Sequence, residues 1–420
     1  MLSLKYIREN IDLVKKSIAA KNVDFDLAKL LEYDKKRRDI IQEVESLKAN
    51  RNIINKKISS SNNVKDNIDI MRSISKDIKK LDIELNTILS KINNDLLYVP
   101  NIVDSSVPIG VDESSNVIVR EWGKKPEFDF DIKGHLELSE KHRLLDFKSA
   151  SKISGSAFPL YTQIGAKYER SLINFMLDTH IAEHAYSEVL TPFIVSSSAP
   201  RTTGNLPKFK DDMYYIELDD MYCIPTAEVP VTNIHSKSIL NEDELPKKYV
   251  AYSPCFRREA GSYGKDTKGL LRVHQFNKVE LVQFVHPDKS YDVLEDLLLN
   301  AETILQKLNL HYRVVSLASG DLSFSAAKCY DIEVWSPFEN KYLEVSSCSN
   351  FESFQARRGD IKFRSNKTNK VDFVHTLNGS GLATPRLMVA LLEAYQKENS
   401  DIEIPGVLRP YLNVNKIKSK

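Results

Sequence analysis

Hydrophobic residues recur in alternating steps of three and four along two stretches near the start of the chain. Such spacing is typical of helices that pack through a heptad seam. The first seam, within residues 27–58, contains two arginines and consists of Leu30, Tyr33, Arg37, Ile40, Val44, Leu47, Arg51, Ile54 and Ile58. The second, within residues 67–97, consists of Met71, Ile74, Ile78, Leu81, Leu85, Ile88, Ile92 and Leu96. Polar, turn-forming residues at 59–67 separate them, so the pattern predicts an antiparallel two-helix coiled coil about 45 Å long at about 1.5 Å per residue.

A proline-bracketed linker follows this hairpin. The segment YVPNIVDSSVPIG contains Pro100 and Pro108 and no periodic apolar pattern, which is typical of a domain boundary. We therefore expect one domain over residues 1–105 and a second over residues 106–420.

The second domain mixes helical and strand-like patterns. Helical spacing covers 165–186 and 292–308, whereas EVLTPFIV (188–195) and the stretch 330–348 have the composition of strands. Pro192 lies within EVLTPFIV, and a proline in a strand belongs at a sheet edge or a bulge. The mixture predicts an α+β fold class.

Residues 249–284 predict a long-tipped β-hairpin. An apolar strand is followed by a loop rich in glycine and cations, and then by an alternating strand from Leu271 to Phe284. The period of two places Arg272, His274, Phe276, Lys278 and Glu280 on one face, and Leu271, Val273, Val279 and Leu281 on the other.

The charged face of this hairpin suits a charged ligand. Arg257 and Arg272 could bind a phosphate bidentately, and Phe276 could stack on a base. A solvated hairpin whose charges pair with one another is the alternative. It is disfavoured because a large aromatic ring interleaved with charges is poorly suited to a face in water.

Near the C-terminus, TLNGSGLATPRLMVALLEAYQ (376–396) predicts a helix that begins with Thr384 as N-cap and Pro385 in the first turn. Arg386 then lies in the first turn, where the helix dipole disfavours a cation. We therefore expect Arg386 to bind an anion. GSGLAT lacks the third small residue of a dinucleotide fingerprint, and GSYGKDT is not a Walker A loop.

Composition narrows the class of protein. The chain has 420 residues, is 42% hydrophobic and 28% charged, and carries a net charge of +1, so any nucleic-acid contact must come from local patches. The four cysteines form no CxxC pair, which favours reduced thiols. No secretory signal or membrane-spanning run is apparent, and we expect a cytoplasmic location with no membrane partner.

The hairpin segment FRREAGSYGKDTKGLLRVHQF resembles motif 2 of the class II aminoacyl-tRNA synthetases, and is close to the seryl-tRNA synthetase version. The resemblance implies that Arg257 holds the ATP α-phosphate, that Phe276 stacks on adenine, and that the loop 261–269 reaches the tRNA acceptor end. The helix with EVLTPFIV is similar to motif 1, which implies a homodimer. The segment 376–396 looks like motif 3, whose arginine, Arg386 here, grips the γ-phosphate.

The same resemblance implies an architecture: an N-terminal coiled-coil arm that reaches the long variable arm of tRNA, followed by a catalytic domain with a central, mostly antiparallel sheet flanked by helices. Lysines and arginines outnumber acids along the arm, as contact with a phosphate backbone requires. The sequence alone favours a plain dimerisation or spacer coil, which is the commoner use of heptads, and the resemblance shifts the prediction to a tRNA-binding arm.

Further family positions match residues of this chain. The implied L-serine site consists of Thr226, Ala227, Glu228, Glu280 and Ser380. The implied ATP site consists of Arg257, Arg258, Glu259, Phe276, Glu344, Val345, Ser346, Ser347 and Arg386, with Glu344 and Ser347 also holding Mg²⁺. Judged from the residues, Thr226 could instead be an ordinary helix cap. Strict alternation would put positions 344 and 347 on opposite faces, unless a strand end or bulge at Ser346 intervenes.

Two neighbouring segments also resemble the family: TTGNLPKF (202–209), beside the active site, and FQARR (354–358), expected to place more cations there. Three features depart from it, namely Arg258 where serine is common, FPLYTQIG (158–165) and APR (199–201). HIAEH (180–184) matches a zinc-peptidase pattern. Two packed or hydrogen-bonded histidines are the alternative that we favour.

The resemblance spans nearly the whole chain and implies a bacterial-type serine–tRNA ligase. Such an enzyme forms seryl-adenylate from L-serine and ATP, and then transfers the seryl group to the terminal ribose of tRNA(Ser). Whether tRNA(Sec) is also charged is left open. The alternative function is a synthetase-like RNA-binding module without activation activity.

Overall fold

The computed structural model describes residues 1–58, 64–260 and 268–419. Its contacts divide the chain into two compact units, Met1–Pro100 and Asn101–Lys420. No helix in the described ranges is long and apolar enough to cross a membrane.

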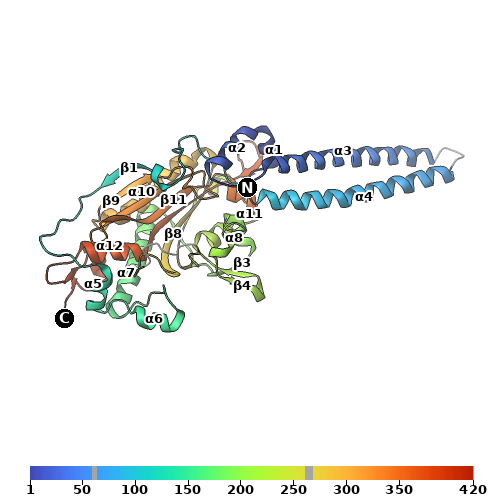
Figure 1. The fold of residues 1–420 in the computed structure, drawn as a ribbon. Coiled ribbons are helices and arrows are strands. Elements are labelled where there is room, and N and C mark those ends of the chain that lie inside the picture. Colours follow the sequence, from blue (N-terminus) through green and yellow to red (C-terminus); the bar gives the residue numbers. More distant parts are fainter. Residues whose placement is uncertain (59–63, 261–267, 420) are drawn as a thin grey trace. The chain divides into compact units, whose positions relative to one another are not determined.

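The first unit is helical. Its elements are α1 (Leu4–Glu9), α2 (Ile11–Ala20), α3 (Leu27–Ile58) and α4 (Val64–Leu96). The helices α3 and α4 run side by side in opposite directions (Figure 1), which confirms the predicted hairpin. Helix α4 begins before the predicted position 67, and Asp66 lies in its first turn, where an acidic residue interacts favourably with the helix dipole.

Much of the predicted seam is buried, for example at Leu30, Ile40 and Ile92, whereas positions such as Leu47 and Leu85 are half-buried. One interaction beside it could not be predicted from apolar spacing. The Asp34 side chain is fully buried and binds three arginines: Nη1 of Arg8 at 2.7 Å, Nη2 of Arg37 at 3.0 Å and Nε of Arg38 at 3.3 Å. Although burial opposes ionisation, Arg8 and Arg37 lower the pKa of Asp34. The carboxylate therefore links α1 to α3.

The second unit is built on a large sheet. Eight strands in the described part form it in the order β1-β9-β10-β11-β14-β8-β7-β2. Neighbours are antiparallel, except that β2 is parallel to β7. This confirms a mostly antiparallel central sheet. The bounds are β1 (Val117–Trp122), β2 (Ser187–Glu188), β7 (Lys247–Phe256), β8 (Gln275–Val285), β9 (Tyr312–Ser316), β10 (Lys328–Ser336), β11 (Lys341–Asn350) and β14 (His375–Ala383).

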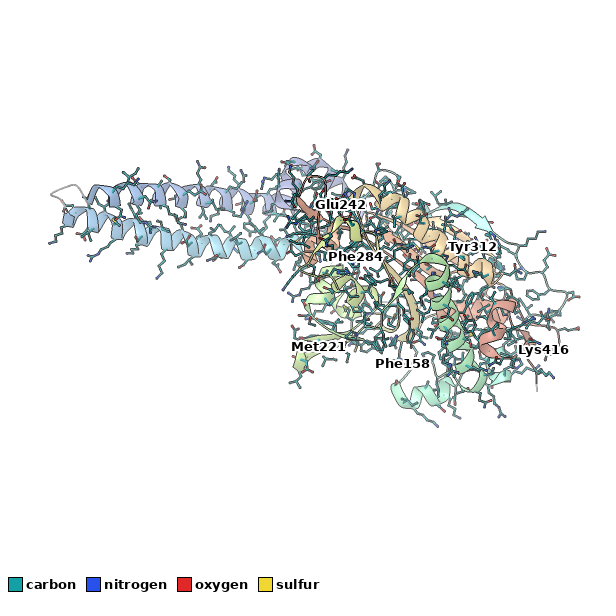
Figure 2. All side chains as sticks on the ribbon, turned by 180° about the vertical axis from the view of Figure 1, so that it is seen from behind. Phe158, Met221, Glu242, Phe284, Tyr312 and Lys416 are labelled. Carbon is teal, nitrogen blue, oxygen red and sulfur yellow. The ribbon has the colours of Figure 1, made fainter. Side chains whose placement is uncertain are left out.

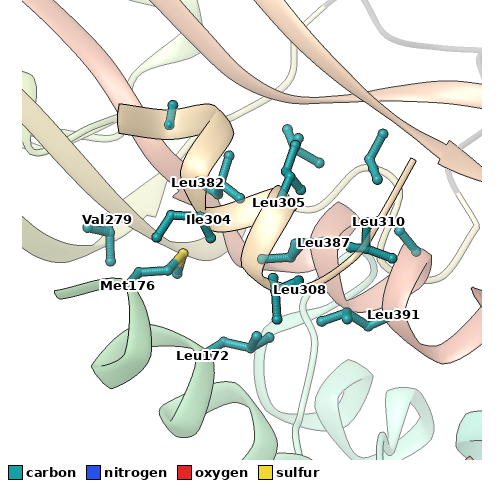
Figure 3. Packing of buried hydrophobic residues seen from close by; sticks show 14 of the residues in the cluster. Leu172, Met176, Val279, Ile304, Leu305, Leu308, Leu310, Leu382, Leu387 and Leu391 are labelled. Carbon is teal, nitrogen blue, oxygen red and sulfur yellow. The ribbon is translucent and has the colours of Figure 1, made fainter. Parts of the chain in front are cut away.

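Three helices cover one face of this sheet: α7 (Gln163–His184), α10 (Ser290–Lys307) and α12 (Thr384–Ala394). Leu172 and Met176 from α7 pack in one buried cluster with Ile304 from α10, Leu387 from α12 and Val279 from β8 (Figure 3). The odd-numbered positions of β8 therefore point into the hydrophobic core, as the period of two predicts.

A second, smaller core lies on the other face. Val282 and Phe284 of β8 pack there against Ala227 and Val231, and Phe284 is labelled in Figure 2. Because even-numbered residues of β8 share this face, Phe276, Lys278 and Glu280 continue the same row. The helices on this side are α9 (Glu228–Asn233) and α11 (Phe354–Gly359).

Smaller elements complete the unit. Two three-stranded sheets have the orders β13-β12-β6 and β3-β5-β4 among the described strands. Their strands are β3 (Ile194–Ser196), β4 (Tyr215–Ile216), β5 (Met221–Cys223), β6 (Ile239–Asn241), β12 (Lys362–Arg364) and β13 (Val371–Phe373). Also present are α5 (His135–His142), α6 (Phe147–Ser154), α8 (Ser198–Thr203), α13 (Arg409–Leu412), β15 (Ile402–Glu403) and β16 (Lys416–Ile417). The 3-10 turns are η1 (Glu113–Ser115), η2 (Lys210–Asp212), η3 (Glu217–Asp219), η4 (Glu242–Glu244), η5 (Pro287–Lys289) and η6 (Gly406–Leu408).

Two predicted strand boundaries were wrong. The second hairpin strand begins at Gln275 instead of Leu271, so Leu271 to His274 belong to the hairpin tip. The predicted strand 188–195 is divided between β2 and β3, with Pro192 in the non-strand stretch between them, because proline cannot donate to a strand ladder. The predicted loop 261–269 lies largely outside the described residues.

Candidate active site

A cavity of about 650 Å³ opens beside the even-numbered face of β8. Most of the predicted site residues line it, although they come from five separate segments of the chain. These are Thr226, Glu228, Arg257, Glu259, Phe276, Glu280, Glu344, Val345, Ser347, Ser380 and Arg386. Three other predicted residues, Ala227, Arg258 and Ser346, do not line it.

One end of the cavity holds two carboxylates, the buried Glu280 and the half-buried Glu228. Oε1 of Glu280 accepts a hydrogen bond from Nδ2 of Asn378 at 3.1 Å, and Oε2 lies 2.6 Å from Nζ of Lys278. Oε1 of Glu228 accepts from Nε2 of Gln355 at 2.6 Å. Burial, and then the charge of Glu280, raise the pKa of Glu228 to about 7. With one lysine for two carboxylates, this end is suited to a ligand ammonium group.

Thr226 and Ser380 border the same end. Oγ1 of Thr226 accepts from the backbone N–H of Glu228 at 3.1 Å, so the local capping bond exists and the residue also faces the cavity. The carbonyl of Ser380 accepts from Oγ of Ser346 at 2.7 Å. Ala227 is buried at the start of α9 and packs in the smaller core. Ser346 and Ala227 therefore lie behind residues that face the ligand space.

The other end is cationic and aromatic. The guanidinium of Arg257 lies 5.1 Å from the centre of the Phe276 ring, and its Nε donates to the carbonyl of Pro225 at 3.3 Å. Nε of Arg272 is 2.6 Å from Oε2 of Glu259. This end therefore offers a flat ring beside a cation.

Arg258 points elsewhere. Its guanidinium lies 5.7 Å from the Tyr214 ring centre, and its backbone N–H donates to the carbonyl of Asp212 at 2.9 Å. The departure from the family pattern at this position thus falls on a side chain outside the cavity lining.

Arg386 lies near the start of α12, as predicted. Its Nε donates to the carbonyl of Leu271 at 3.1 Å, and its Nη1 to the carbonyl of Glu344 at 2.9 Å. The expected N-cap was wrong, because Ala383 occupies that position and Thr384 is the first helical residue. The hydroxyl of Thr384 instead contacts the carboxylate of Glu169.

A β-bulge resolves the conflict between positions 344 and 347. Ile332 pairs with Ser346, whereas the next residue, Glu333, pairs with Glu344. Val345 is therefore the extra residue, one position from the predicted bulge. The bulge brings Glu344 and Ser347 to the same cavity, where a carboxylate and a hydroxyl are oxygen donors of the type that Mg²⁺ prefers.

A second hollow of about 700 Å³ adjoins the first. Arg272, Glu344, Ser347 and Arg386 line both. Asp331 lines the second hollow, and its burial, followed by the nearby charge of Glu344, raises the pKa of Asp331 well above its usual value. The two hollows meet where the predicted metal-binding oxygens and phosphate-binding arginines lie together.

The loop TTGNLPKF contributes to the first cavity through Thr203, Gly204, Asn205 and Phe209. Gly204 follows α8 with φ of +92°, a conformation that side chains with a Cβ rarely adopt.

The cations of FQARR, expected beside the site, do not themselves line the cavity. Arg358 donates to the carbonyls of Arg201 at 3.1 Å and Leu206 at 3.3 Å, and burial lowers its pKa to about 10. Arg357 lies 4.5 Å from the Phe373 ring centre. The residue of this segment that contacts a predicted site residue is Gln355, which donates a hydrogen bond to Glu228.

His180 and His184 form a packed pair. Their Nδ1 atoms are 2.9 Å apart, and burial followed by the charge of His184 lowers the pKa of His180 to about 3. Among the described residues, a metal-compatible group of three occurs only at His135, Glu339 and Glu393. There, Nε2 of His135 already accepts from the backbone N–H of Leu270, and Glu393 is hydrogen-bonded by Ser336 and Phe338. The zinc-peptidase interpretation is not supported.

Sequence reasoning gave no role to three residues of the acidic end: Lys278, Gln355 and Asn378. A signal for Asn378 was present, because it is two residues from Ser380 in β14 and therefore shares its face. The partners of Gln355 and Lys278 depend on contacts between distant segments, which spacing does not reveal.

Comparisons with known proteins cover the whole chain. A family model described as the seryl-tRNA synthetase N-terminal domain matches residues 1–103, and one described as the class II tRNA synthetase core domain (G, H, P, S and T) matches 209–395. The chain is 53% identical over 422 residues to a serine–tRNA ligase from Syntrophobacter fumaroxidans, covering 99% of this chain and 100% of that protein. It is 51% identical to the corresponding ligase from Geobacter sulfurreducens, with 98% of each chain covered.

Solved structures agree. Seryl-tRNA synthetase from Pyrococcus horikoshii, crystallised with ATP, matches with a TM-score of 0.96 and 37% identity over 100% of both chains. Cytoplasmic serine–tRNA ligase from Naegleria fowleri, in complex with AMP, matches with a TM-score of 0.88 and 30% identity, covering 98% of this chain and 96% of that one.

Proposed function

Because this chain belongs to the seryl-tRNA synthetase family of class II synthetases, we propose how its own residues carry out the ATP-dependent attachment of L-serine to tRNA. The enzyme is a serine–tRNA ligase. In the first step, a serine carboxylate oxygen attacks the α-phosphorus of ATP, the bond to the bridging oxygen breaks, and pyrophosphate leaves. In the second, the terminal ribose hydroxyl of tRNA(Ser) attacks the seryl carbonyl and releases AMP.

One observation carries the assignment of roles: a single cavity has two carboxylates at one end and an aromatic ring with arginines at the other. An amino acid and a nucleotide can lie in it end to end, with the serine carboxylate towards the phosphates. Such a reaction requires no protein nucleophile. Positioning and charge stabilisation account for the acceleration.

We assign the acidic end to serine. Glu228 and Thr226 hold the ammonium group, with Ala227 fixing the backbone between them. Glu280 and Ser380 receive the serine hydroxyl. Sites that hydrogen-bond a substrate hydroxyl reject analogues without it by about 10⁴ to 10⁵, because the buried polar groups would remain unpaired. This predicts strong discrimination against alanine.

The cationic end is assigned to ATP. The ring of Phe276 stacks on adenine, and Arg257 holds the α-phosphate. Arg386 holds the γ-phosphate, because its position in the first turn of α12 favours an anion. The remaining ATP positions are Arg258, Glu259, Val345, Ser346 and Ser347, of which Arg258 and Ser346 would act from outside the cavity lining.

The donor set of Glu344 and Ser347 fits Mg²⁺, because the Val345 bulge presents both oxygens to one space. When bound, Mg²⁺ would neutralise negative charge on the phosphates. The residues of the chain supply the remaining positive charge through Arg257 and Arg386.

The first 105 residues are proposed to form the tRNA-binding domain and 106–420 the aminoacylation domain. The helical hairpin α3–α4, with its excess of basic residues, supports contact with the tRNA backbone. We further propose a homodimer and a cytoplasmic location, and charging assays with tRNA(Sec) test whether that tRNA is a second substrate.

Amino-acid-dependent exchange between ATP and pyrophosphate tests this function with a panel of amino acids, with and without chelation of Mg²⁺. We expect exchange with serine alone, its loss on chelation, and its loss in Glu280→Ala. ATP binding by Glu280→Ala should persist, which serves as the control for folding. Folded protein that exchanges with no amino acid would support the RNA-binding module instead.

A further inference from the structure

A buried hydrogen-bond network lies behind the active site, on the opposite face of the sheet. Its centre is Glu169 of α7, whose side chain is almost fully buried. Oε1 of Glu169 accepts a hydrogen bond from Nδ2 of Asn277 at 2.9 Å and contacts the hydroxyl of Thr384. The hydroxyl of Tyr252 donates to Oδ1 of Asn277 at 3.1 Å. One carboxylate oxygen therefore joins α7, β8 and α12, and β7 is attached through Asn277.

Neither Asn277 nor Thr384 lines the cavity, but residues next to both of them do. Asn277 lies between Phe276 and Lys278, and Thr384 lies two residues before Arg386. The hydroxyl of Thr384 is also 3.1 Å from the carbonyl of Asn277. The network therefore fixes the start of α12 against the strand that carries the aromatic ring.

We propose that Glu169 is a positioning residue that sets the arrangement of Arg386 relative to Phe276, and so the fit of ATP between them. The proposal rests on the nucleotide site assigned above. Glu169 touches no substrate; it acts through Asn277 and Thr384.

The choice of a carboxylate at this position favours such a role. A fully buried carboxyl group is costly unless its hydrogen bonds are made, and burial raises the pKa of Glu169 to about 7. Tyr161 is partly buried, but its hydroxyl is buried beside the same group, and this burial, followed by the charge of Glu169, raises the pKa of Tyr161. An apolar residue would fill the space at lower cost, but it could not hold the side chains of Asn277 and Thr384 together.

A purely structural role is the competing explanation, and the chain contains a matched control. Glu302 of α10 is equally buried and accepts from the Tyr312 hydroxyl at 2.9 Å and from Nε of Arg120 at 3.0 Å. Glu302 does not line either hollow. Loss of Glu302 should lower stability without changing ATP binding.

The test compares Glu169→Ala, Thr384→Val, Thr384→Ser and Glu302→Gln. Melting temperature and the KM values for ATP and serine are measured for each variant by serine-dependent exchange. We expect Glu169→Ala and Thr384→Val to raise the KM for ATP by about tenfold to a hundredfold, the range for a lost hydrogen bond to a charged group. Their KM for serine should change less than about twofold, because the acidic end is held by Gln355 and Asn378 instead. Thr384→Ser, which keeps the hydroxyl, should restore the KM for ATP.

Equal increases in both KM values, or a lower melting temperature with both unchanged, would overturn the proposal. So would Glu302→Gln if it gave the same selective loss of ATP binding. If Glu169→Ala does not fold, the comparison of Thr384→Val with Thr384→Ser still tests whether the network sets ATP binding. Absence of exchange in the unmodified enzyme would instead count against the proposed function.

Discussion

The raised pKa of Glu228 predicts how serine binding depends on pH. An ammonium ligand binds the ionised carboxylate, whereas the free site holds a proton on Glu228 below about pH 7. Binding of serine below that pH must therefore release this proton. The KM for serine should be constant above pH 7 and should rise as the pH falls.

The size of the expected change in the KM for serine follows from the pKa shift of Glu228. The pKa of Glu228 rises from 4.5 to about 7, which corresponds to about 3 kcal/mol against ionisation. At one pH unit below the pKa, roughly a tenth of the sites are ionised, so the KM for serine should increase about tenfold per unit. A carboxylate of ordinary pKa would show no such change above pH 5.

The assay is serine-dependent exchange between pH 5.5 and 8.5 at saturating ATP. Glu228→Gln cannot ionise, so its KM for serine should lose the slope and exceed the plateau of the unmodified enzyme by about tenfold to a hundredfold, the range for a lost charged hydrogen bond. Glu169→Gln provides a control, because Glu169 also has a pKa of about 7 but lies outside the serine pocket. The slope should persist in that variant. A flat profile in the unmodified enzyme, or a slope that survives in Glu228→Gln, would refute the assignment.

Two further predictions concern stability and tRNA. The pKa values of Glu169 and Glu228 rise from 4.5 to about 7 on folding, so the stability that each protonated group contributes is complete below pH 4.5 and is lost as the pH rises through 7. The free energy of urea unfolding of the ligand-free enzyme should therefore fall by up to about 3 kcal/mol for each group. Variants with Gln at either position should lack this fall. Separately, replacing the exposed Lys76, Lys79 and Lys80 of α4 by Glu should weaken tRNA charging and its dependence on salt, since these side chains are proposed to meet phosphates. Exchange without tRNA should be unchanged; an equal loss of both activities would mean that the hairpin is structural.

Periodicity predicted the elements that depend on one burial pattern. The seams of α3 and α4 and the two faces of β8 follow from spacing alone, because each side chain position is fixed by a period of 3.6 or 2. Boundaries were less accurate. Leu271 and Val273 alternate correctly with Arg272 and His274, yet they belong to the hairpin tip, since alternation does not reveal where strand pairing begins.

The candidate site was predicted as a set of residues, and the contacts that hold those residues were not. Thr384 shows the reason: its place before Pro385 suggested an N-cap, but the hydroxyl contacts Glu169, more than two hundred residues away in the chain. A contact with so distant a residue cannot be predicted from local helix propensity. The exact position of the bulge at Val345 could not be predicted for a related reason. A bulge in β11 is defined by its register with β10 and cannot be assigned from one strand.

Some residues of the candidate site lower the stability of the free protein. Glu280 and Lys278 are buried beside the half-buried Glu228, with an excess of negative charge that an apolar core would not need. Arg386 lies at a helix start, where the dipole opposes it. In the proposed assignment, each of these local penalties would be relieved by a ligand group of the opposite charge: the serine ammonium for the carboxylates and the ATP phosphates for the arginine. Complementarity to the two substrates would then account for both departures, whereas stability of the free protein accounts for neither.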